Sequence, residues 1–129
     1  MVCHHFGVNL PYRPFTPGHS TPLAFLADAF FHPTADVAAW ANRSGGKTLT
    51  ASILAALEFL FTDNLQARVL AGSEDQATNL YEYWQNWCDG PLAARVCGQV
   101  QRRRTRVSGG RMEILAASQR QVRGRKIQR

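Results

Sequence analysis

Apolar residues along the chain gather in short runs that predict alternating strands and helices. The run DVAAWA (36–41) has neither a helical nor an alternating period and predicts a buried strand. The segment GGKTLTASILAALEFLF (45–61) is apolar on nearly all faces, which predicts a helix covered by a sheet on one side and by more protein on the other. The run ARVLAGS (67–73) predicts a second strand, so a strand–helix–strand unit is expected in the middle of the chain.

Helix caps mark the elements on either side of this unit. Before it, a proline-rich stretch excludes a long element ahead of Leu23, and TPLAFLADAFF (21–31) predicts a short helix capped by Thr21 with Pro22 in its first position. After it, Ser73 and Gln76 form a capping-box pair, and the helix that they open has one apolar face. That face consists of Ala77, Leu80, Tyr81, Trp84 and Trp87.

The last third of the chain predicts a helix end and a hairpin. Asp89-Gly90-Pro91 ends the preceding helix. The runs RRRTRV (102–107) and RMEILAA (111–117) predict the two strands of a hairpin that turns at Ser108-Gly109-Gly110. The resulting order, β-α-β-α-β-β, predicts a sheet of the α/β class.

Composition limits the class of protein. A chain of 129 residues allows one domain at most, and its 45% hydrophobic and 19% charged residues indicate a globular protein. No apolar run reaches the ~18 residues of a membrane helix. The start, MVCHHFGVNL, lacks the pattern of a secretory signal, so we expect a cytoplasmic protein without membrane contact.

The cysteines give little information. Cys3, Cys88 and Cys97 show no zinc-site spacing. Cys3 beside His4 and His5 could suggest a metal, but adjacent histidines rarely aim at one ion, so a polar N-terminus is the simpler interpretation.

Charge is divided unevenly along the chain. Residues 1–94 contain four basic and eight acidic side chains, for a net charge of −4, whereas residues 95–129 contain eleven basic side chains and only Glu113, for +10; together they give the +6 of the whole chain. Such a basic block can neutralise nucleic-acid phosphates, or it can be a solvated tail or a surface that further protein covers. The densest run, which supplies the candidate nucleic-acid contacts, is Arg102, Arg103, Arg104 and Arg106.

The segment ANRSGGKTLTAS (41–52) has the spacing of a phosphate-binding loop. Gly46-Lys47-Thr48 matches the end of G-x-x-x-x-G-K-[ST], with Ala41 in place of the first glycine. In such a loop small residues let backbone N–H groups surround the phosphates, the lysine binds the β- and γ-phosphates, and the threonine hydroxyl ligates Mg²⁺. Because the expected strand–loop–helix context is present, we expect nucleotide binding rather than a helix cap. The candidate nucleotide-binding residues are Ser44, Gly45, Gly46, Lys47 and Thr48, with Thr48 also the Mg²⁺ ligand.

The same segment resembles the Walker A segment of the large terminase subunit of tailed phages, the ATPases that pump DNA into capsids. That family often has alanine or serine at the first position and an arginine four residues before the lysine, where Arg43 stands. TPLAFLADAFF resembles the segment before that loop, RVLAGSEDQA the turn after the loop helix, and ILAASQRQVRGRKIQR the stretch before the Walker B strand. The resemblance covers most of residues 20–129, and only the loop is specific.

The resemblance implies a RecA-like P-loop NTPase fold, an α/β three-layer sandwich that is incomplete here, because the sequence stops at Arg129 before a Walker B strand and before a nuclease domain. It implies an N-terminal segment (1–36) with contacts on the adenine side and a partial ATPase core (37–129). The implied cofactors are ATP and Mg²⁺. The implied partners are double-stranded DNA, the portal protein, the small terminase subunit and further copies of the chain, in a bacterial host cell.

Individual roles follow from the motif and the resemblance. Lys47 and Arg43 are the catalytic candidates; the resemblance gives Arg43 the role of sensing the γ-phosphate, and the alternative is a surface arginine. Pro22 or Phe25 could flank the base, although core packing is the stronger expectation for Phe25. Arg123-Gly124 is a candidate backbone turn toward the nucleotide.

Hydrolysis needs more than this loop. Phosphoryl transfer requires a carboxylate that holds Mg²⁺ and a group that orients the attacking water. Glu58 lies about three turns beyond Lys47 in the predicted helix, and Glu74 and Asp75 stand where they stabilise a helix dipole. We therefore expect this chain to bind ATP with little or no hydrolysis.

Two other functions are consistent with the sequence. One is a fragment of a helicase-like P-loop ATPase. The other is a small basic protein that binds nucleic acid through residues 95–129 and carries a vestigial loop, so that its DNA binding would depend on salt but not on ATP.

Overall fold

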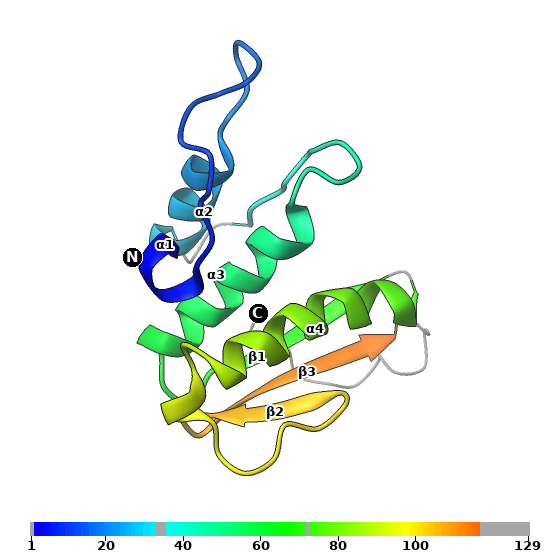
Figure 1. Ribbon diagram of the computed structural model, residues 1–129. Coiled ribbons are helices and arrows are strands. Elements are labelled where there is room, and N and C mark those ends of the chain that lie inside the picture. The colour runs from blue at the N-terminus through cyan, green and yellow to red at the C-terminus, as the bar shows by residue number, and fades with distance from the viewer. Residues whose placement is uncertain (1, 33–35, 72, 117–129) are drawn as a thin grey trace.

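The computed structural model describes residues 2–32, 36–71 and 73–116, which form a mixed α/β structure. The elements are α1 (Val2–Phe6), α2 (Pro22–Phe31), α3 (Lys47–Phe61), β1 (Gln66–Ala71), α4 (Glu74–Asp89), the short 3-10 helix η1 (Ala93–Arg95), β2 (Arg104–Val107) and β3 (Gly110–Ala116). The three strands lie in the order β1-β3-β2, with β1 parallel and β2 antiparallel to β3. As Figure 1 shows, α4 lies over the sheet, and α3 and α2 are stacked beyond it.

Side-chain caps start two of the helices as the sequence predicts. The Thr21 hydroxyl accepts the Ala24 N–H at 3.0 Å, and Pro22 occupies the first turn of α2. The Ser73 hydroxyl accepts the Gln76 N–H at 3.3 Å and so begins α4. The predicted end of the helix at residue 61 and the predicted break at Asp89-Gly90-Pro91 are also confirmed, with Thr62 and Gly90 as the C-caps.

The core forms around the apolar face of α4. Trp84 and Tyr81 are fully buried, and the Trp84 ring lies 5.0 Å from that of Phe59 on α3. Farther along α4, Trp87 Nε1 donates to Ser52 Oγ at 3.1 Å, and Ser52 Oγ donates to the Leu49 carbonyl at 2.7 Å. These contacts join α3 to α4, and α4 in turn packs on β1 and β3.

Helix α3 is covered differently from the prediction. It packs mainly between α2 and α4, and it is α4 that rests on the sheet. The reason lies in α4, whose amphipathic face buries two tryptophans and a tyrosine and so provides the larger apolar surface for both neighbours.

The expected first strand is wrong. Residues 36–41 are irregular, all their side chains are exposed, and Trp40 is 100% exposed. A strand requires hydrogen bonds to a neighbouring strand, and within the described part of the chain this segment forms none with the sheet. The observed order within the described residues is therefore α-α-α-β-α-β-β, with the η1 turn before the last two strands, and these residues do not form the expected three-layer arrangement around a central sheet.

The predicted hairpin is confirmed, and a tight turn closes it. Ser108 and Gly109 both have positive φ, 48° and 77°, as a two-residue hairpin turn of the I′ kind requires. At Gly110 the backbone of β3 passes very close to the start of β1. A Cβ added there would lie only 2.2 Å from the Leu65 carbonyl oxygen, so the position requires glycine. The Arg111 N–H donates to that same oxygen at 2.8 Å and sets the register between β1 and β3.

No helix within residues 2–32, 36–71 and 73–116 combines the length and the apolar character needed to cross a membrane.

The close approach at Gly110 yields a stability prediction. Gly110→Ala should lower the free energy of unfolding by about 1–3 kcal/mol, as overpacking typically does, because backbone rather than a flexible side chain stands in the way. Chemical denaturation followed by far-UV circular dichroism measures this. Ser108→Gly, in the same turn, is the comparison variant and should destabilise the chain less than Gly110→Ala. It removes the 3.2 Å hydrogen bond that Ser108 Oγ accepts from Arg95 Nη1, but a φ of 48° favours glycine. Equal midpoints for Gly110→Ala and the parent chain would contradict the described register.

Candidate functional site

A cavity of about 680 Å³ lies between α2, the segment that precedes α3, and the loop that opens α3. This volume lies within the ~300–1,000 Å³ of small-molecule sites. One wall comes from residues 18–22 and from Phe25 and Asp28 of α2, another from residues 37–41, and a third from Gly45, Lys47 and Thr50.

The loop before α3 is folded tightly and needs its glycines. Ser44 and Gly46 have positive φ, 63° and 74°. Gly45 donates its N–H to the Asn42 carbonyl at 3.2 Å, and a Cβ there would lie 2.5 Å from Asn42 Oδ1. Consecutive turns of this kind let main-chain N–H groups face the same space, which is the property that anion-binding loops use.

Lys47 is held at this loop by uncharged acceptors. Its Nζ donates to the Ala41 carbonyl at 2.7 Å and to the Asn42 carbonyl at 2.6 Å. Because the side chain is exposed, the ammonium can exchange these acceptors for a ligand. A phosphate oxygen is a stronger acceptor for this ammonium than a neutral carbonyl, because the attraction between opposite charges adds to the hydrogen bond.

The first turn of α3 also contains main-chain N–H groups that donate no hydrogen bond to a described residue. Its N-cap is Gly46, which provides no side-chain cap, and the first main-chain bond of the helix runs from the Thr50 N–H to the Gly46 carbonyl at 2.9 Å. The N–H groups of residues 47–49 have no acceptor among the described residues. They therefore add to the positive end of the helix dipole beside the Lys47 ammonium.

The α2 wall differs from expectation at Phe25. Phe25 is only partly buried and lines the cavity with Pro22, and it is not part of the hydrophobic core cluster, so the preference for a core role is wrong. Asp28 lies three residues farther along the same helix face. Its Oδ1 is 3.0 Å from His32 Nδ1, and both side chains are largely exposed.

The structure brings together only part of the predicted nucleotide set. Gly45 and Lys47 line the cavity, whereas Ser44, Gly46 and Thr48 are exposed beside it without lining it. Arg43 is also exposed and is not a lining residue. The predicted turn at Arg123-Gly124 lies outside the described residues.

Sequence reasoning missed Asp28 and Trp40 in this cavity. Asp28 follows Pro22 and Phe25 at a spacing of three, so the helical period of α2 carried the signal. Trp40 was assigned to a buried strand because apolar runs of six residues look alike whether they are buried or exposed.

The basic run falls on a different surface. Arg104 and Arg106 lie on β2, both exposed on the same face of the strand, with the buried Thr105 between them on the other face. Arg102 and Arg103 precede the strand and are exposed. In Figure 1 the hairpin lies on the far side of α4 from the loop that opens α3.

No group of three or more His, Cys, Asp or Glu side chains that could hold a metal ion occurs in the described ranges. Cys3, His4 and His5 lie together on α1, and the two histidine rings contact each other edge to face at 5.0 Å.

Comparison of the chain with protein-family models, with curated proteins and with solved structures finds no match. The functional assignment therefore rests on the residues and their geometry.

Two buried side chains of α4, Tyr81 and Cys88, have raised pKa values. Burial raises the pKa of Tyr81 to about 12, although its hydrogen bond with Thr105 Oγ1, 2.6 Å long, acts in the opposite direction. The Tyr81 hydroxyl also donates to the Gln101 carbonyl at 2.8 Å and so ties the strand entry to α4. Burial raises the pKa of Cys88 to about 12 as well, and the Asp89 charge adds to this shift.

These shifts predict a loss of stability in alkali. The pKa values in the folded chain, about 12, lie above the ordinary values of 10.0 for tyrosine and 9.0 for cysteine. The unfolded chain therefore releases these protons first, and the free energy of unfolding should fall as the pH rises from 9 to 12. Tyr81→Phe removes one of the two groups and should flatten that slope between pH 10 and 12. Denaturation series at several pH values measure the slope, and equal slopes for the two chains would contradict the burial of this hydroxyl.

Proposed function

We propose that this chain binds ATP with Mg²⁺ through the loop that opens α3, as the N-terminal part of a DNA-packaging ATPase of the terminase large-subunit kind. One observation carries the proposal. The Lys47 ammonium, held only by neutral carbonyls, and the open N–H groups of the first helical turn adjoin a 680 Å³ cavity with aromatic walls.

The phosphates belong at the α3 end of the cavity. There Lys47 supplies the positive charge, Gly45 and Gly46 allow close approach of the main chain, and the N–H groups of the first turn supply further donors. Replacing the Ala41 and Asn42 carbonyls by charged phosphate oxygens makes the hydrogen bonds of Lys47 stronger.

The base and the ribose belong at the α2 end. Phe25, Pro22 and Trp40 offer apolar and aromatic surface for a base. Asp28 is the one carboxylate among the lining residues, and its negative charge disfavours phosphates at this end while it offers an acceptor for a ribose hydroxyl. The charge distribution of the cavity therefore orients the nucleotide.

The Thr48 hydroxyl is the group on this chain that would bind the magnesium ion. When bound, the ion supplies charge neutralisation between the phosphates. The chain's own residues bind and orient the nucleotide, and no described carboxylate adjoins the Lys47 end of the cavity. We therefore propose binding with little or no turnover.

The resemblance extends the proposal to the whole enzyme. It gives double-stranded DNA, the portal protein, the small terminase subunit and further copies of the chain as partners, in the cytoplasm of a bacterial host. It also gives Arg43 the role of sensing the γ-phosphate and stabilising the charge of the transition state.

The alternative of a basic nucleic-acid-binding protein is supported by one observation, the exposed arginines of β2 on a surface away from the loop. It predicts DNA binding that is unchanged by ATP and by Lys47→Ala. A helicase-like fragment would share the loop chemistry and differ in partners.

Removal of the lysine charge tests the proposal. Lys47→Ala should weaken Mg·ATP binding by about 1.5–3 kcal/mol, or at least tenfold, because a charge-assisted hydrogen bond is lost. Titration followed by the fluorescence of the exposed Trp40, and by calorimetry, gives both dissociation constants. Arg13→Ala is the matched control, since it removes an exposed positive charge outside the cavity. Equal losses in both variants would count against a role for the loop.

Turnover is tested separately. The purified chain should bind ATP without multiple turnovers, as measured by phosphate release. Multiple turnovers that Lys47→Ala abolishes would overturn the proposal of binding alone. In a chain that also contains the Walker B strand, Arg43→Ala should leave the dissociation constant unchanged and lower kcat.

A further inference from the structure

The face of the sheet turned away from α4 is rich in arginine. The register places Arg106 of β2 opposite Arg111 of β3, and Arg111 beside Gln66 of β1. In the next row Arg104 lies opposite Glu113, which lies beside Arg68. The buried Thr105, Val107, Met112 and Ile114 alternate with these residues on β2 and β3 and face α4.

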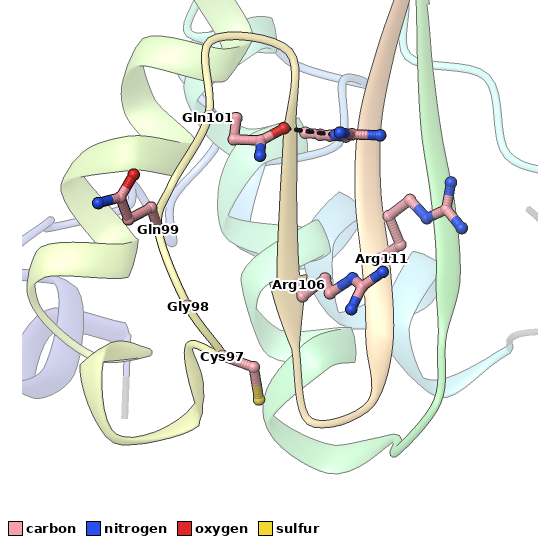
Figure 2. A pocket seen from close by; sticks show the side chains of 7 residues that line it. Cys97, Gly98, Gln99, Gln101, Arg106 and Arg111 are labelled. Carbon is pink, nitrogen blue, oxygen red and sulfur yellow. Dashed lines mark hydrogen bonds between the residues drawn. The ribbon is translucent and has the colours of Figure 1, made fainter.

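Two cavities on this face of the sheet share three of their lining residues. One, of about 270 Å³, is lined by Cys97, Gly98, Gln99, Gln101 and three arginines. The other, also about 270 Å³, is lined by Gln66, Gly109 and Gly110. Arg106, Arg111 and Cys97 line both, so the two cavities adjoin at these side chains, and the pair is called the groove from here on. Figure 2 shows Arg106 and Arg111 side by side in this groove, each reaching in the direction of β1.

The carboxylate on this face is already engaged. Glu113 Oε2 lies 3.4 Å from Arg68 Nε, and these two side chains are only 12% and 15% exposed. Arg104 Nε donates to Gln101 Oε1. Asp63, near the hairpin turn, pairs with Arg95 at 3.4 Å. Neither Arg106 nor Arg111 forms an ion pair or a side-chain hydrogen bond with a described residue.

Arg106 and Arg111 therefore form a pair of like charges directly opposite each other across two strands, an arrangement that destabilises a sheet. Neither can relieve it by losing a proton, because guanidinium stays charged. An anion between them removes the repulsion. Phosphate suits two guanidinium groups best, since each fork can donate two parallel N–H bonds to its oxygens.

The backbone holds the two arginines in place before any ligand arrives. The Arg106 carbonyl accepts the Cys97 N–H at 2.9 Å, and the Arg111 N–H donates to Leu65 at 2.8 Å. Gly98, with a φ of 80°, turns the adjoining segment so that it forms the outer wall of the groove. Binding therefore orders side chains alone, which lowers its entropic cost.

We propose that Arg106 and Arg111 form a binding site for a phosphate group, with Arg104 and Gln101 at its edge. The site is separate from the loop at Lys47 and does not depend on ATP binding there. The phosphate belongs either to a nucleic-acid backbone or to a small phosphorylated molecule, because the groove is open and presents the same donors to both.

The small-molecule arm uses pyrophosphate as the probe, with amide chemical shifts of the ¹⁵N-labelled chain as the readout. The Lys47→Ala chain should show shifts at Arg106, Arg111, Cys97 and Gly98 as pyrophosphate is added. Arg106→Gln and Arg111→Gln should each weaken this binding at least tenfold. Arg13→Gln, which removes the same charge elsewhere, should leave it unchanged.

The nucleic-acid arm uses a fluorescent 20-mer, as duplex and as single strand, with anisotropy as the readout. If the phosphate is carried by nucleic acid, Arg106→Gln and Arg111→Gln should each weaken binding. For the duplex, each should also reduce the slope of the logarithm of the binding constant against the logarithm of the salt concentration by about one. Arg13→Gln should change neither quantity. If only pyrophosphate responds, the ligand is a small molecule. Circular dichroism of every variant confirms that it is folded.

The proposal is overturned if neither probe distinguishes the sheet variants from Arg13→Gln. Loss of pyrophosphate binding in Lys47→Ala alone would also overturn it and would assign the phosphate to the loop. Because the pyrophosphate titration is run on the Lys47→Ala chain as well as on the parent, failure of this site and failure of the ATP site are told apart.

Discussion

Burial of the apolar face of α4 joins the helices to the sheet and sets the positions of both. Trp84 lies against Phe59 of α3, and the same helix covers the inner face of the sheet. Truncating a buried aromatic residue of this size typically costs about 3–5 kcal/mol, a large part of the stability of a small domain. Trp84 Nε1 is buried without a hydrogen-bond partner among the described residues, so it is the apolar contact rather than a polar one that stabilises this position.

Hydrogen bonds from α4 position the backbone segments that carry both candidate sites. The Trp87–Ser52–Leu49 chain of hydrogen bonds fixes the start of α3, where Lys47 and the open N–H groups lie. On the other side, Tyr81 ties residues 101–105 to α4 and so fixes the strand that carries Arg104 and Arg106. The two phosphate-binding surfaces that we propose thus lie on opposite sides of one buried helix.

Local chemistry made most of the elements predictable from sequence. The caps at Thr21 and Ser73, the period of α4 and the Ser-Gly-Gly turn each act within a few residues, and each is confirmed. The segment 36–41 was mispredicted because a strand depends on a distant partner that its own residues do not specify. For the same reason Arg111 was not recognised beside Arg106, since only the register of the hairpin brings them together. Asp28 was missed because only the folded chain places it in the same cavity as Lys47.

We propose that a nucleotide binds where Lys47 meets the first turn of α3. The most direct measurement is a titration of the ¹⁵N-labelled chain with Mg·ATP, followed by the amide signals and by the Trp40 indole signal. We expect the largest changes at residues 45–49 and at Trp40, with the inner face of the sheet unaffected. Changes confined to the hairpin, or no change at millimolar ATP, would contradict this proposal.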